Sequence, residues 1–330
     1  MRELKYNPTS FDFLKNDLKK LEYFFYDYTE SLEGILRETV KNTLTISGKR
    51  IRPSLFLICA RNENYNIDYL LPAAAAIEII HTASLIHDDI IDKSILRRGK
   101  RTIHYTYDND TAKFVGDYLF THTFSLLNSY KIPRILEEMS YAAQFLVIGE
   151  FNQLKTKRNL KQSEEVYLEK INEKTSSLFR LSCVLGGILS GSDEKNIENM
   201  KKFGEYIGIS FQINDDLIDV DINGSSINVG KPIGNDFKHG DITLPFIYGL
   251  RDPVFKKALK PLLNKSSFSQ EELKKMLNLL SNTDAIKTTR DKFNFYLLKA
   301  REIISLIDGE ERKKGLEKVC DYIMQATNLL

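Results

Sequence analysis

The chain has few of the residues that mark secreted, disulfide-bonded or thiolate-metal proteins. Its 330 residues include three cysteines, Cys59, Cys183 and Cys320, and none of them belongs to a CxxC pair. Each lies in an apolar helical context, which favours a buried, reduced thiol. Reduced thiols are typical of the cytoplasm, and we therefore expect a cytoplasmic protein.

An excess of charge and a long apolar run are also missing. Lys and Arg number 47 against 45 Asp and Glu, so the net charge of +2 gives no indication of a nucleic-acid partner. Residues 1–13 lack a basic-then-apolar secretory pattern. The most apolar stretch, residues 72–86, is shorter than a bilayer span and contains Glu78 and His81. We expect a soluble protein with at most peripheral membrane contact.

Strand-like alternation and linkers rich in Pro, Gly and Ser are scarce, and apolar residues recur at helical spacing instead. Helices are predicted over residues 12–45, 68–92, 112–129, 133–154, 163–189, 193–220, 242–250, 284–306 and 310–324. Asp68 is the expected N-cap of the second, and Ser269 with Glu272 forms a capping box that starts a further helix. Length alone would favour two domains. Without a linker or a repeat, we expect one all-α domain over residues 1–330, a helical bundle.

Three aspartates share the end of the predicted helix over residues 68–92. Asp88 and Asp92 lie one turn apart on one face, with Asp89 beside them. Like charges this close destabilise a helix, and a cation would relieve their repulsion. Mg²⁺ suits such a site because it takes one or two carboxylates together with water and phosphate oxygens. Apolar neighbours such as Ile90 and Ile91 weaken the alternative of a solvated acidic surface.

A second cluster, Asp215, Asp216 and Asp219, has the same spacing. Two identical clusters predict that two helices direct carboxylates into one cavity from opposite walls, where Mg²⁺ would bridge a diphosphate. Neither cluster has the central glycine of an EF-hand loop, so a calcium loop is not expected.

Residues 221–241 form the one long stretch without helical periodicity. The segment contains Gly224, Gly230, Lys231, Pro232, Gly234, Lys238 and Gly240. Loops of this length in compact domains are commonly functional, and the two lysines favour a lid over an anion.

Basic residues flank the first cluster on both sides. Lys49 and Arg52 lie upstream of it, and Arg97 and Arg98 follow it after one short turn. Arginine binds phosphate in bidentate fashion and lysine acts as a point charge. His81 lies two helical turns before Asp88, on the same face of the predicted helix. Taken singly, each is more typical of a surface ion pair or a core histidine. Together they predict a metal-bound diphosphate beside a second, metal-free one.

These motifs follow the order found in the trans-isoprenyl (polyprenyl) diphosphate synthases, which the sequence resembles from Gly48 to Pro245. The resemblance is carried by GKRIRP, IEIIHTASLIHDDIIDKSILRRGK, GDYLF, Glu173-Lys174-Thr175, GISFQINDDLID and GKPIGNDFKHGDITLP. The finer resemblance is to the catalytic second component (component II) of heptaprenyl diphosphate synthase. It implies a polyprenyl synthase domain with the all-α isoprenoid-synthase fold, a central cavity and usually a dimer.

The resemblance also implies a role for each matching residue. The diphosphate of isopentenyl diphosphate would be held by Lys49, Arg52, His81 and Arg98. The allylic diphosphate would be held by Arg97, Lys174, Gln212 and Lys231, with Thr175 and Phe211 lining its site. Several Mg²⁺ ions bridging that diphosphate would be held by Asp88, Asp92, Asp215 and Asp219. Asp89 and Asp216 complete the catalytic aspartates.

The implied reaction runs through ionisation, condensation and elimination. Metal and cations stabilise the departing pyrophosphate, and a dry cavity protects the allylic carbocation from water. Oxygens near Lys174, Thr175 and Gln212 would stabilise that cation until the double bond of isopentenyl diphosphate attacks it. Released pyrophosphate would take the final proton.

Two small residues predict the length of the product. Ala83 and Ser84 lie about one turn, roughly 5.4 Å, before Asp88 on the helix. In short-chain members of the family a bulky aromatic blocks this place, so we expect a product longer than farnesyl diphosphate. The alternative is purely structural: small side chains at these two positions would only allow neighbouring helices to pack closely. Ile79 and Ile80, one turn deeper, are candidates for the next barrier.

Other functions are weaker predictions from the same residues. A geranylgeranyl-type synthase would need only a shorter channel. A class I terpene cyclase shares the fold and first cluster, but its second metal motif differs from Asp215–Asp219, and it would have no use for Lys49, Arg52 and Arg98. A non-catalytic subunit usually lacks one acidic cluster. The expected assembly is a homodimer, or a heterodimer with a small regulatory component.

Overall fold

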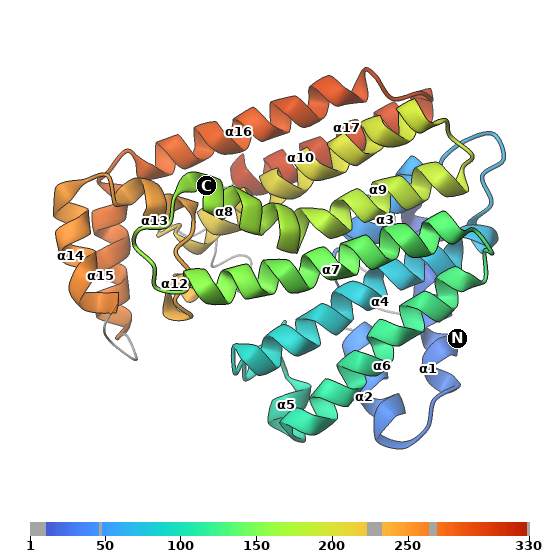
Figure 1. The fold of residues 1–330 in the computed structure, drawn as a ribbon, viewed down its shortest axis with the longest axis horizontal. Helices are drawn as coiled ribbons and strands as arrows, with labels where there is room; N and C mark the ends of the chain where they lie inside the picture. The colour runs from blue at the N-terminus through green and yellow to red at the C-terminus, as the bar shows by residue number, and fades with distance from the viewer. Residues whose placement is uncertain (1–10, 46–47, 223–232, 264–268, 329–330) are drawn as a thin grey trace. The chain divides into compact units, whose positions relative to one another are not determined.

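The computed structural model describes residues 11–45, 48–222, 233–263 and 269–328 (Figure 1). Their contacts divide the chain into two compact units. Unit 1 comprises residues 1–142, 181–201 and 307–316, and unit 2 comprises residues 143–180, 202–306 and 317–330. Four of the five boundaries fall inside helices, and the fifth lies in the short connection between residues 304 and 310. The expectation of one domain over residues 1–330 stays a prediction.

Helices make up most of the described chain. The first half contains η1 (Asp12–Leu14), α1 (Lys15–Glu30), α2 (Gly34–Leu44), α3 (Ile51–Cys59), α4 (Ile67–Ile91), α5 (Ile103–Thr106), α6 (Asn109–Asn128) and α7 (Pro133–Thr156). The second half contains α8 (Glu164–Ile171), η2 (Asn172–Ser176), α9 (Ser177–Leu189), α10 (Glu194–Asp219), α12 (Asn235–Lys238), α13 (Leu244–Gly249), α14 (Pro253–Leu263), α15 (Gln270–Ser281), α16 (Ala285–Ile304) and α17 (Glu310–Asn328).

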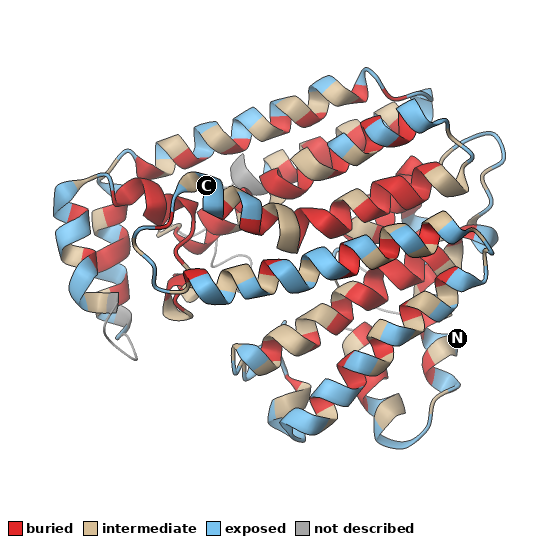
Figure 2. Ribbon diagram, in the orientation of Figure 1, coloured by how far each residue is buried: buried red, intermediate tan, exposed pale blue. Residues whose placement is uncertain are grey.

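Helix α4 is the core helix of unit 1. Its apolar residues occupy every face, and most of the helix is buried, as the red positions along α4 in Figure 2 show. At 25 residues it has the predicted length, shifted by one residue, and is long enough to span a bilayer. However, 67% of its most apolar window is buried inside the protein, which is typical of a core helix. Its N-cap is Asn66, whose side chain accepts from the Asp68 amide, so the prediction of Asp68 as the cap was wrong.

Helix α6 lies antiparallel beside α4 (Figure 1). Near one end, an added Cβ on Gly116 would lie 2.4 Å from Nε2 of His87. Near the other end, the Ala73 amide donates to the Tyr130 hydroxyl over 3.1 Å. Both contacts correspond to the same alignment of the two antiparallel helices. That alignment places Leu119 of α6 opposite Ala83 and Ser84, the predicted chain-length residues of α4.

A two-stranded ribbon is the sheet of the described residues, and the sequence did not predict it. Strands β1 (Leu96–Arg97) and β2 (Lys100–Arg101) pair antiparallel around a two-residue turn. The turn residues Arg98 and Gly99 have φ of +50° and +77°, as a tight hairpin requires. Strands of two residues are too short for alternation to be seen in the sequence.

In unit 2, the helices predicted over residues 163–189 and 193–220 form, but with an interruption. Helix α8 is capped at its N-terminus by Ser163, whose side chain accepts from the Val166 amide. Residues 172–176 then form a single π-helical turn, η2, before α9 begins. Such turns are rare and occur frequently at functional sites. The Ser269–Glu272 capping box is present at the start of α15, as predicted.

Three further predictions concern the cysteines and the segment over residues 221–241. All three cysteines are free and buried, as predicted. Residues 235–238 form the short helix α12, so the segment predicted to lack helix contains one. Lys231, Gly224, Gly230 and Pro232, the part of that segment on which the predicted lid depends, lie outside the described residues.

Candidate active site

The first aspartate cluster lies at the C-terminal end of α4. Asp88 belongs to the last turn, and Asp92 is the C-cap, with its amide bonded to the Asp88 carbonyl over 2.8 Å. Both residues are half-buried. Carboxylates at this end face the negative pole of the helix dipole as well as one another. The two electrostatic costs add, so a bound divalent cation would relieve both.

Asp89, the middle aspartate, is buried and bonded to the ribbon. Its Oδ1 accepts from Nε of Arg97 over 2.9 Å and from Nη2 over 2.6 Å. Burial raises the pKa of Asp89, and the hydrogen bonds from Arg97 oppose that shift. Arg97, predicted to hold the allylic diphosphate, therefore fixes β1 to α4 in this structure.

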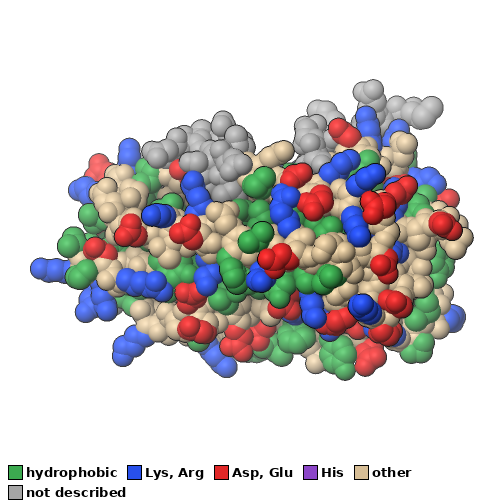
Figure 3. Space-filling view, turned by 90° about the horizontal axis from the view of Figure 1, so that it is seen from above, with side chains coloured by type: hydrophobic (Ala, Val, Ile, Leu, Met, Phe, Trp, Pro, Cys, Tyr) green, Lys and Arg blue, Asp and Glu red, His purple; other side chains and the backbone are tan. Residues whose placement is uncertain are grey.

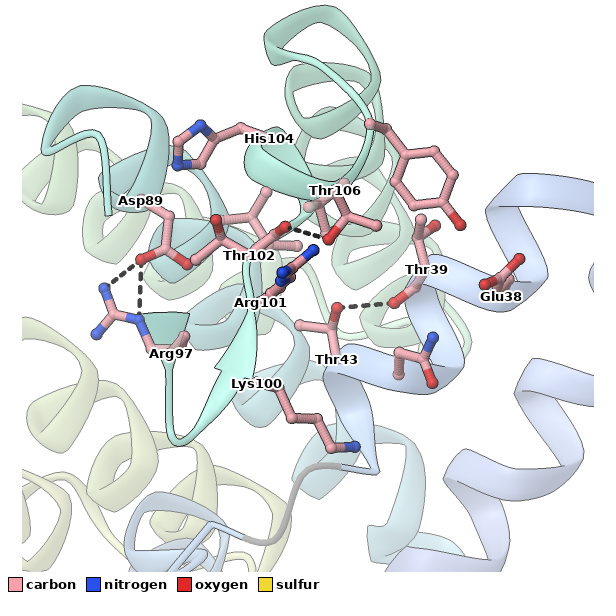
Figure 4. A pocket seen from close by; sticks show the side chains of 14 residues that line it. Glu38, Thr39, Thr43, Asp89, Arg97, Lys100, Arg101, Thr102, His104 and Thr106 are labelled. Carbon is pink, nitrogen blue, oxygen red and sulfur yellow. Dashed lines mark hydrogen bonds and ion pairs between the residues drawn. The ribbon is translucent and has the colours of Figure 1, made fainter. Parts of the chain in front are cut away.

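A pocket of about 270 Å³ lies beside this ion pair (Figure 4). Threonines of α2 and α5, together with Lys100 and Arg101 of the ribbon, surround it. Its volume falls below that of usual small-molecule sites, and Ala83 and Ser84 are not among its lining residues. The pocket is therefore too small and wrongly placed for a prenyl tail.

The residues predicted to hold isopentenyl diphosphate gather in unit 1. Nη1 of Arg52 lies 3.3 Å from Nε2 of His81. Burial, and then the positive charges of Arg52 and Arg98, hold the pKa of His81 well below its usual value. His81 is thus a neutral hydrogen-bonding group at neutral pH. An added Cβ on Gly48 would lie 2.6 Å from Nη1 of Arg98, so that guanidinium approaches the backbone next to Lys49.

The chain-length residues follow on α4. Ala83 is fully buried, whereas Ser84 is half-buried and donates its hydroxyl to the His81 carbonyl over 2.8 Å. The register of α4 on α6 brings the buried Leu119 opposite them. The sequence analysis named residues of α4 alone for this place and did not identify Leu119, because nothing in the sequence gives the register between two helices.

The second aspartate cluster lies at the end of α10 in unit 2. Asp216 is buried and accepts from the Tyr167 hydroxyl over 2.6 Å and from Nε2 of Gln212 over 2.9 Å. Burial, followed by the negative charge of Asp236, raises the pKa of Asp216 to about 7. Asp215 is half-buried. The division between a buried middle aspartate and a more accessible first one repeats that of the first cluster.

Asp219 differs from the other predicted metal ligands. Its carboxylate oxygens accept from the amides of Asn235 and Asp236 over 3.0 and 3.2 Å, and its carbonyl accepts from Gly234 over 2.7 Å. Asp219 is buried and holds the start of α12. A metal at this carboxylate would have to compete with these backbone donors.

Lys174 and Thr175 lie in the π-helical turn. Nζ of Lys174 contacts Glu150 and donates to Oε1 of Gln153 over 2.7 Å. Lys174 approaches α7 closely because Gly149 has no side chain: an added Cβ would lie 2.7 Å from the Lys174 amide nitrogen. Thr175 donates to Oε1 of Gln212 over 2.8 Å.

An aromatic contact extends this group of residues. The ring of Phe211 lies 5.3 Å from that of Phe179. Unit 2 therefore brings together four predicted residues of the allylic site, Lys174, Thr175, Phe211 and Gln212. Tyr167 joins them through Asp216, and the sequence analysis did not find it.

Within the residues that the structure describes, no group of three or more His, Cys, Asp or Glu side chains is arranged to hold a metal by itself. Two half-buried carboxylates four residues apart, Asp88 and Asp92, still fit Mg²⁺, which completes its shell with water and phosphate oxygens. The prediction that the two aspartate clusters share one cavity stays a prediction.

Comparison with known proteins decides the family. A family model described as polyprenyl synthetase matches residues 33–280. The chain belongs to the polyprenyl synthetase family. Component 2 of the heptaprenyl diphosphate synthase of Bacillus subtilis is 35% identical over 314 residues, covering 95% of this chain and 89% of that protein. The short chain isoprenyl diphosphate synthase of Methanocaldococcus jannaschii is 31% identical, with 94% and 95% covered.

The fold is that of the polyprenyl synthases. A crystal structure of polyprenyl synthase from Caulobacter crescentus, complexed with calcium and isoprenyl diphosphate, matches with a TM-score of 0.88 at 28% identity. The match covers 96% of both chains. The predicted all-α isoprenoid-synthase fold and the predicted family are thereby confirmed. As a polyprenyl synthetase, the chain is a prenyltransferase, and the terpene-cyclase alternative loses its support.

Proposed function

We propose that the chain condenses isopentenyl diphosphate head-to-tail with an allylic diphosphate such as farnesyl diphosphate, and that the reaction depends on Mg²⁺. The product is an all-trans polyprenyl diphosphate of medium or long chain. The observation that carries this proposal lies in unit 1. Half-buried Asp88 and Asp92 end a helix on which the small residues Ala83 and Ser84 lie one turn earlier.

Asp88 and Asp92 would hold Mg²⁺ at the first cluster, and Asp215 is the most accessible carboxylate of the second. When bound, the metal would neutralise the charge of the departing pyrophosphate. The calcium and isoprenyl diphosphate in the Caulobacter crescentus complex support a divalent cation in this family. Asp219 is the weakest candidate ligand, because two backbone amides already occupy its carboxylate.

The chain's own residues then bind, orient and shield the reactants. Arg52 and Arg98 hold the diphosphate of isopentenyl diphosphate, and neutral His81 contributes a hydrogen bond without adding charge. Lys174 binds the allylic diphosphate, and Thr175 with Gln212 presents oxygen atoms to the developing cation. No protein base is required if released pyrophosphate takes the proton.

The length of the product is the finer part of the proposal. Small residues at positions 83 and 84 support a channel that continues beyond fifteen-carbon farnesyl diphosphate, and the Bacillus subtilis relative is named for a heptaprenyl product. The alternative is a shorter, geranylgeranyl-type product, and the Methanocaldococcus jannaschii relative is a short chain synthase. Leu119, opposite the two small residues, is the side chain that would favour the shorter product.

One experiment tests both parts. The purified chain is incubated with Mg²⁺, farnesyl diphosphate and radiolabelled isopentenyl diphosphate, and the products are sized by chromatography. We expect labelled chains longer than farnesyl diphosphate, and no product after EDTA until Mg²⁺ is restored. Undiminished turnover in EDTA would contradict metal dependence.

The same assay tests the need for a partner. The Bacillus subtilis relative is named component 2, which supports a partner for this chain as well. Turnover only after addition of a cell extract would indicate an obligate heterodimer with a small regulatory component. Turnover by the purified chain would indicate that it acts without one, and no turnover in either case would overturn the proposed function.

A further inference from the structure

Arg50 differs from the two cationic residues on either side of it. Lys49 is exposed and Arg52 is half-buried, whereas Arg50 is 3% exposed. Its backbone is left-handed, with φ of +48° and ψ of +36°. A non-glycine residue in this region is uncommon, and burying a guanidinium is expensive unless it is fully paired. The left-handed backbone and the buried charge are both unfavourable by themselves, so contacts with surrounding residues must stabilise them.

That surrounding structure is a set of hydrogen bonds within unit 1. Nε and Nη2 of Arg50 donate to the two carboxylate oxygens of Glu22 on α1 over 2.7 and 3.2 Å. Nη1 donates to Oε1 of Glu78 on α4 over 2.8 Å, and Nη2 to the Leu44 carbonyl at the end of α2 over 2.6 Å. The Phe25 ring lies 5.1 Å from the guanidinium carbon. One side chain thus connects three helices.

The same contacts set the start of α3. The Arg50 carbonyl accepts the first helical bond, from the Ser54 amide over 3.0 Å, and α3 begins at Ile51. Arg52 is therefore the second residue of a helix whose first turn starts at the backbone of Arg50. Lys49 directly precedes Arg50 and lies beside Gly48, over which the Arg98 guanidinium is placed.

Charge gives Glu78 and Glu22 a second effect. Arg50 and the two glutamates carry a net charge of −1, beside Arg98, whose guanidinium also experiences the positive charges of Arg50 and Arg97. Burial lowers the pKa of the Arg98 guanidinium, and the negative charge of Glu78 opposes that shift. Glu78 also lies one turn before His81 on α4. A buried carboxylate under several cations offsets their repulsion before an anionic substrate arrives.

Stability alone is a poor explanation for this arrangement. Buried ion pairs are often no more stabilising than well-packed apolar residues of similar volume, because both charges lose their hydration. Apolar residues in place of Arg50, Glu22 and Glu78 could neither fix the direction of the backbone next to Arg50 nor supply a negative charge beside the other cations.

We propose that Arg50, held by Glu22 and Glu78, is a positioning residue that orients Lys49, Arg52 and Arg98 toward the diphosphate of isopentenyl diphosphate. The inference rests on the proposed function and extends it to residues with no direct contact to substrate. Arg50 reaches the substrate only through its neighbours.

The test separates positioning from stability. In Arg50→Met and Glu78→Gln, we expect KM for isopentenyl diphosphate to rise about tenfold or more, the effect of one misplaced charge-assisted hydrogen bond. KM for farnesyl diphosphate should change by less than about twofold. Arg50→Lys should lie between Met and wild type, since lysine restores the charge without the fork of donors.

Arg61→Met is the matched control. Arg61 also pairs with a carboxylate of α1, Asp17, over 2.7 Å and stacks on Tyr65 at 4.0 Å, and neither partner is one of the residues predicted to hold isopentenyl diphosphate. It should lower the midpoint of thermal unfolding without raising KM for isopentenyl diphosphate. If both Met variants behave alike, or if Arg50→Met raises both KM values equally, the positioning role is overturned.

Three further outcomes bear on the proposal. If Arg50→Met does not fold, Glu22→Gln, at a less buried position, should give the same selective rise in KM at smaller size, and an unchanged KM there overturns the proposal. If wild-type protein forms no product, alone or with extract, the proposed function fails and this inference with it. If the wild-type protein forms product but the variants raise the KM values for both substrates equally, the inference is overturned and the proposed function stands.

Discussion

The aspartates of the two motifs divide into buried and accessible residues. Asp89 and Asp216 are buried and bonded to Arg97 and to Tyr167, respectively, while Asp88 and Asp215 are half-buried. Residues next to each other on a helix point about 100° apart, so one of them can face the interior while the other does not. The spacing of the motifs identifies all six carboxylates but does not assign these two roles.

Replacing Ala83 by Phe should shorten the product. The aromatic ring would enter the space between α4 and α6 one turn beyond Asp88, where the register of the two helices places the buried Leu119 opposite. We expect the product distribution to move toward farnesyl or geranylgeranyl diphosphate in the chromatographic assay. Ser84→Ala, which keeps a small side chain, is the control and should leave chain length unchanged. Unchanged products in Ala83→Phe would refute the assignment of this channel.

Asp241 should make stability depend on pH. Its Oδ1 is buried without a hydrogen-bond partner among the described residues, and its Oδ2 accepts from Gln153 over 2.8 Å. Burial raises the pKa of Asp241 to about 6, with the positive charge of Lys170 opposing it. The folded state therefore holds a proton that the unfolded chain releases near pH 4. Folding stability is lost as pH rises from 4 to 6.

Asp241→Asn removes this titration. The variant should be more stable than wild type at pH 7, by on the order of 1 to 2 kcal/mol, and the difference should shrink toward pH 4. Urea unfolding at several pH values measures it. A stability difference that stays constant with pH would show that the carboxylate is not buried in its charged form.

At the scale of the element, periodicity predicted the long helices well and their details poorly. Helices α6, α7, α10 and α16 begin and end within about three residues of the predicted ranges. Helix α3 was missed because nearly all of its residues are buried, which leaves no alternation of faces to detect. The π-helical turn η2 was missed because it depends on close contact between Lys174 and Gly149.

Tyr167→Phe tests whether α8 supports the second motif. The change removes the hydroxyl that donates to Asp216 and leaves a buried carboxylate with one donor fewer. Outer hydrogen bonds of this kind typically change metal affinity about tenfold or more, so the Mg²⁺ concentration for half-maximal activity should rise by about that factor. Tyr65→Phe removes a similar bond, to Asp17 over 2.9 Å, away from both motifs and should leave the Mg²⁺ requirement unchanged.

At the scale of the whole molecule, the outer face of α7 is a notable apolar surface. Its exposed large apolar side chains are Tyr141, Phe145, Val147, Ile148, Phe151 and Leu154. Figure 2 shows many exposed, pale blue positions along α7. Elsewhere, for example on the face in Figure 3, acidic and basic side chains are interspersed. Contiguous apolar residues on a helix exposed to water commonly mark an interface with another protein chain. The expected homodimer would cover them.

Phe151→Glu should therefore weaken self-association. Phe151 is 60% exposed on α7, and a buried charge at a dimer interface would have no partner. We expect light scattering to show a dimer for wild type and a larger monomer fraction for the variant. Val254→Glu, at an equally apolar and 69% exposed position on α14, is the control and should stay dimeric. A monomeric wild-type chain would refute this assembly and leave α7 for a different component.

The sequence by itself determined the family, through the order of its motifs, and the all-α fold and the identity of the acidic and basic residues, through period and spacing along one chain. The tertiary structure decided which of these side chains are buried and which partners they bind, because spacing along the chain does not show this. It turned Arg97 and Tyr167 toward the middle aspartates, bonded Asp219 to the start of α12, and buried Arg50 between Glu22 and Glu78. The physical reason is that burial and pairing are set by side chains brought together from distant parts of the chain.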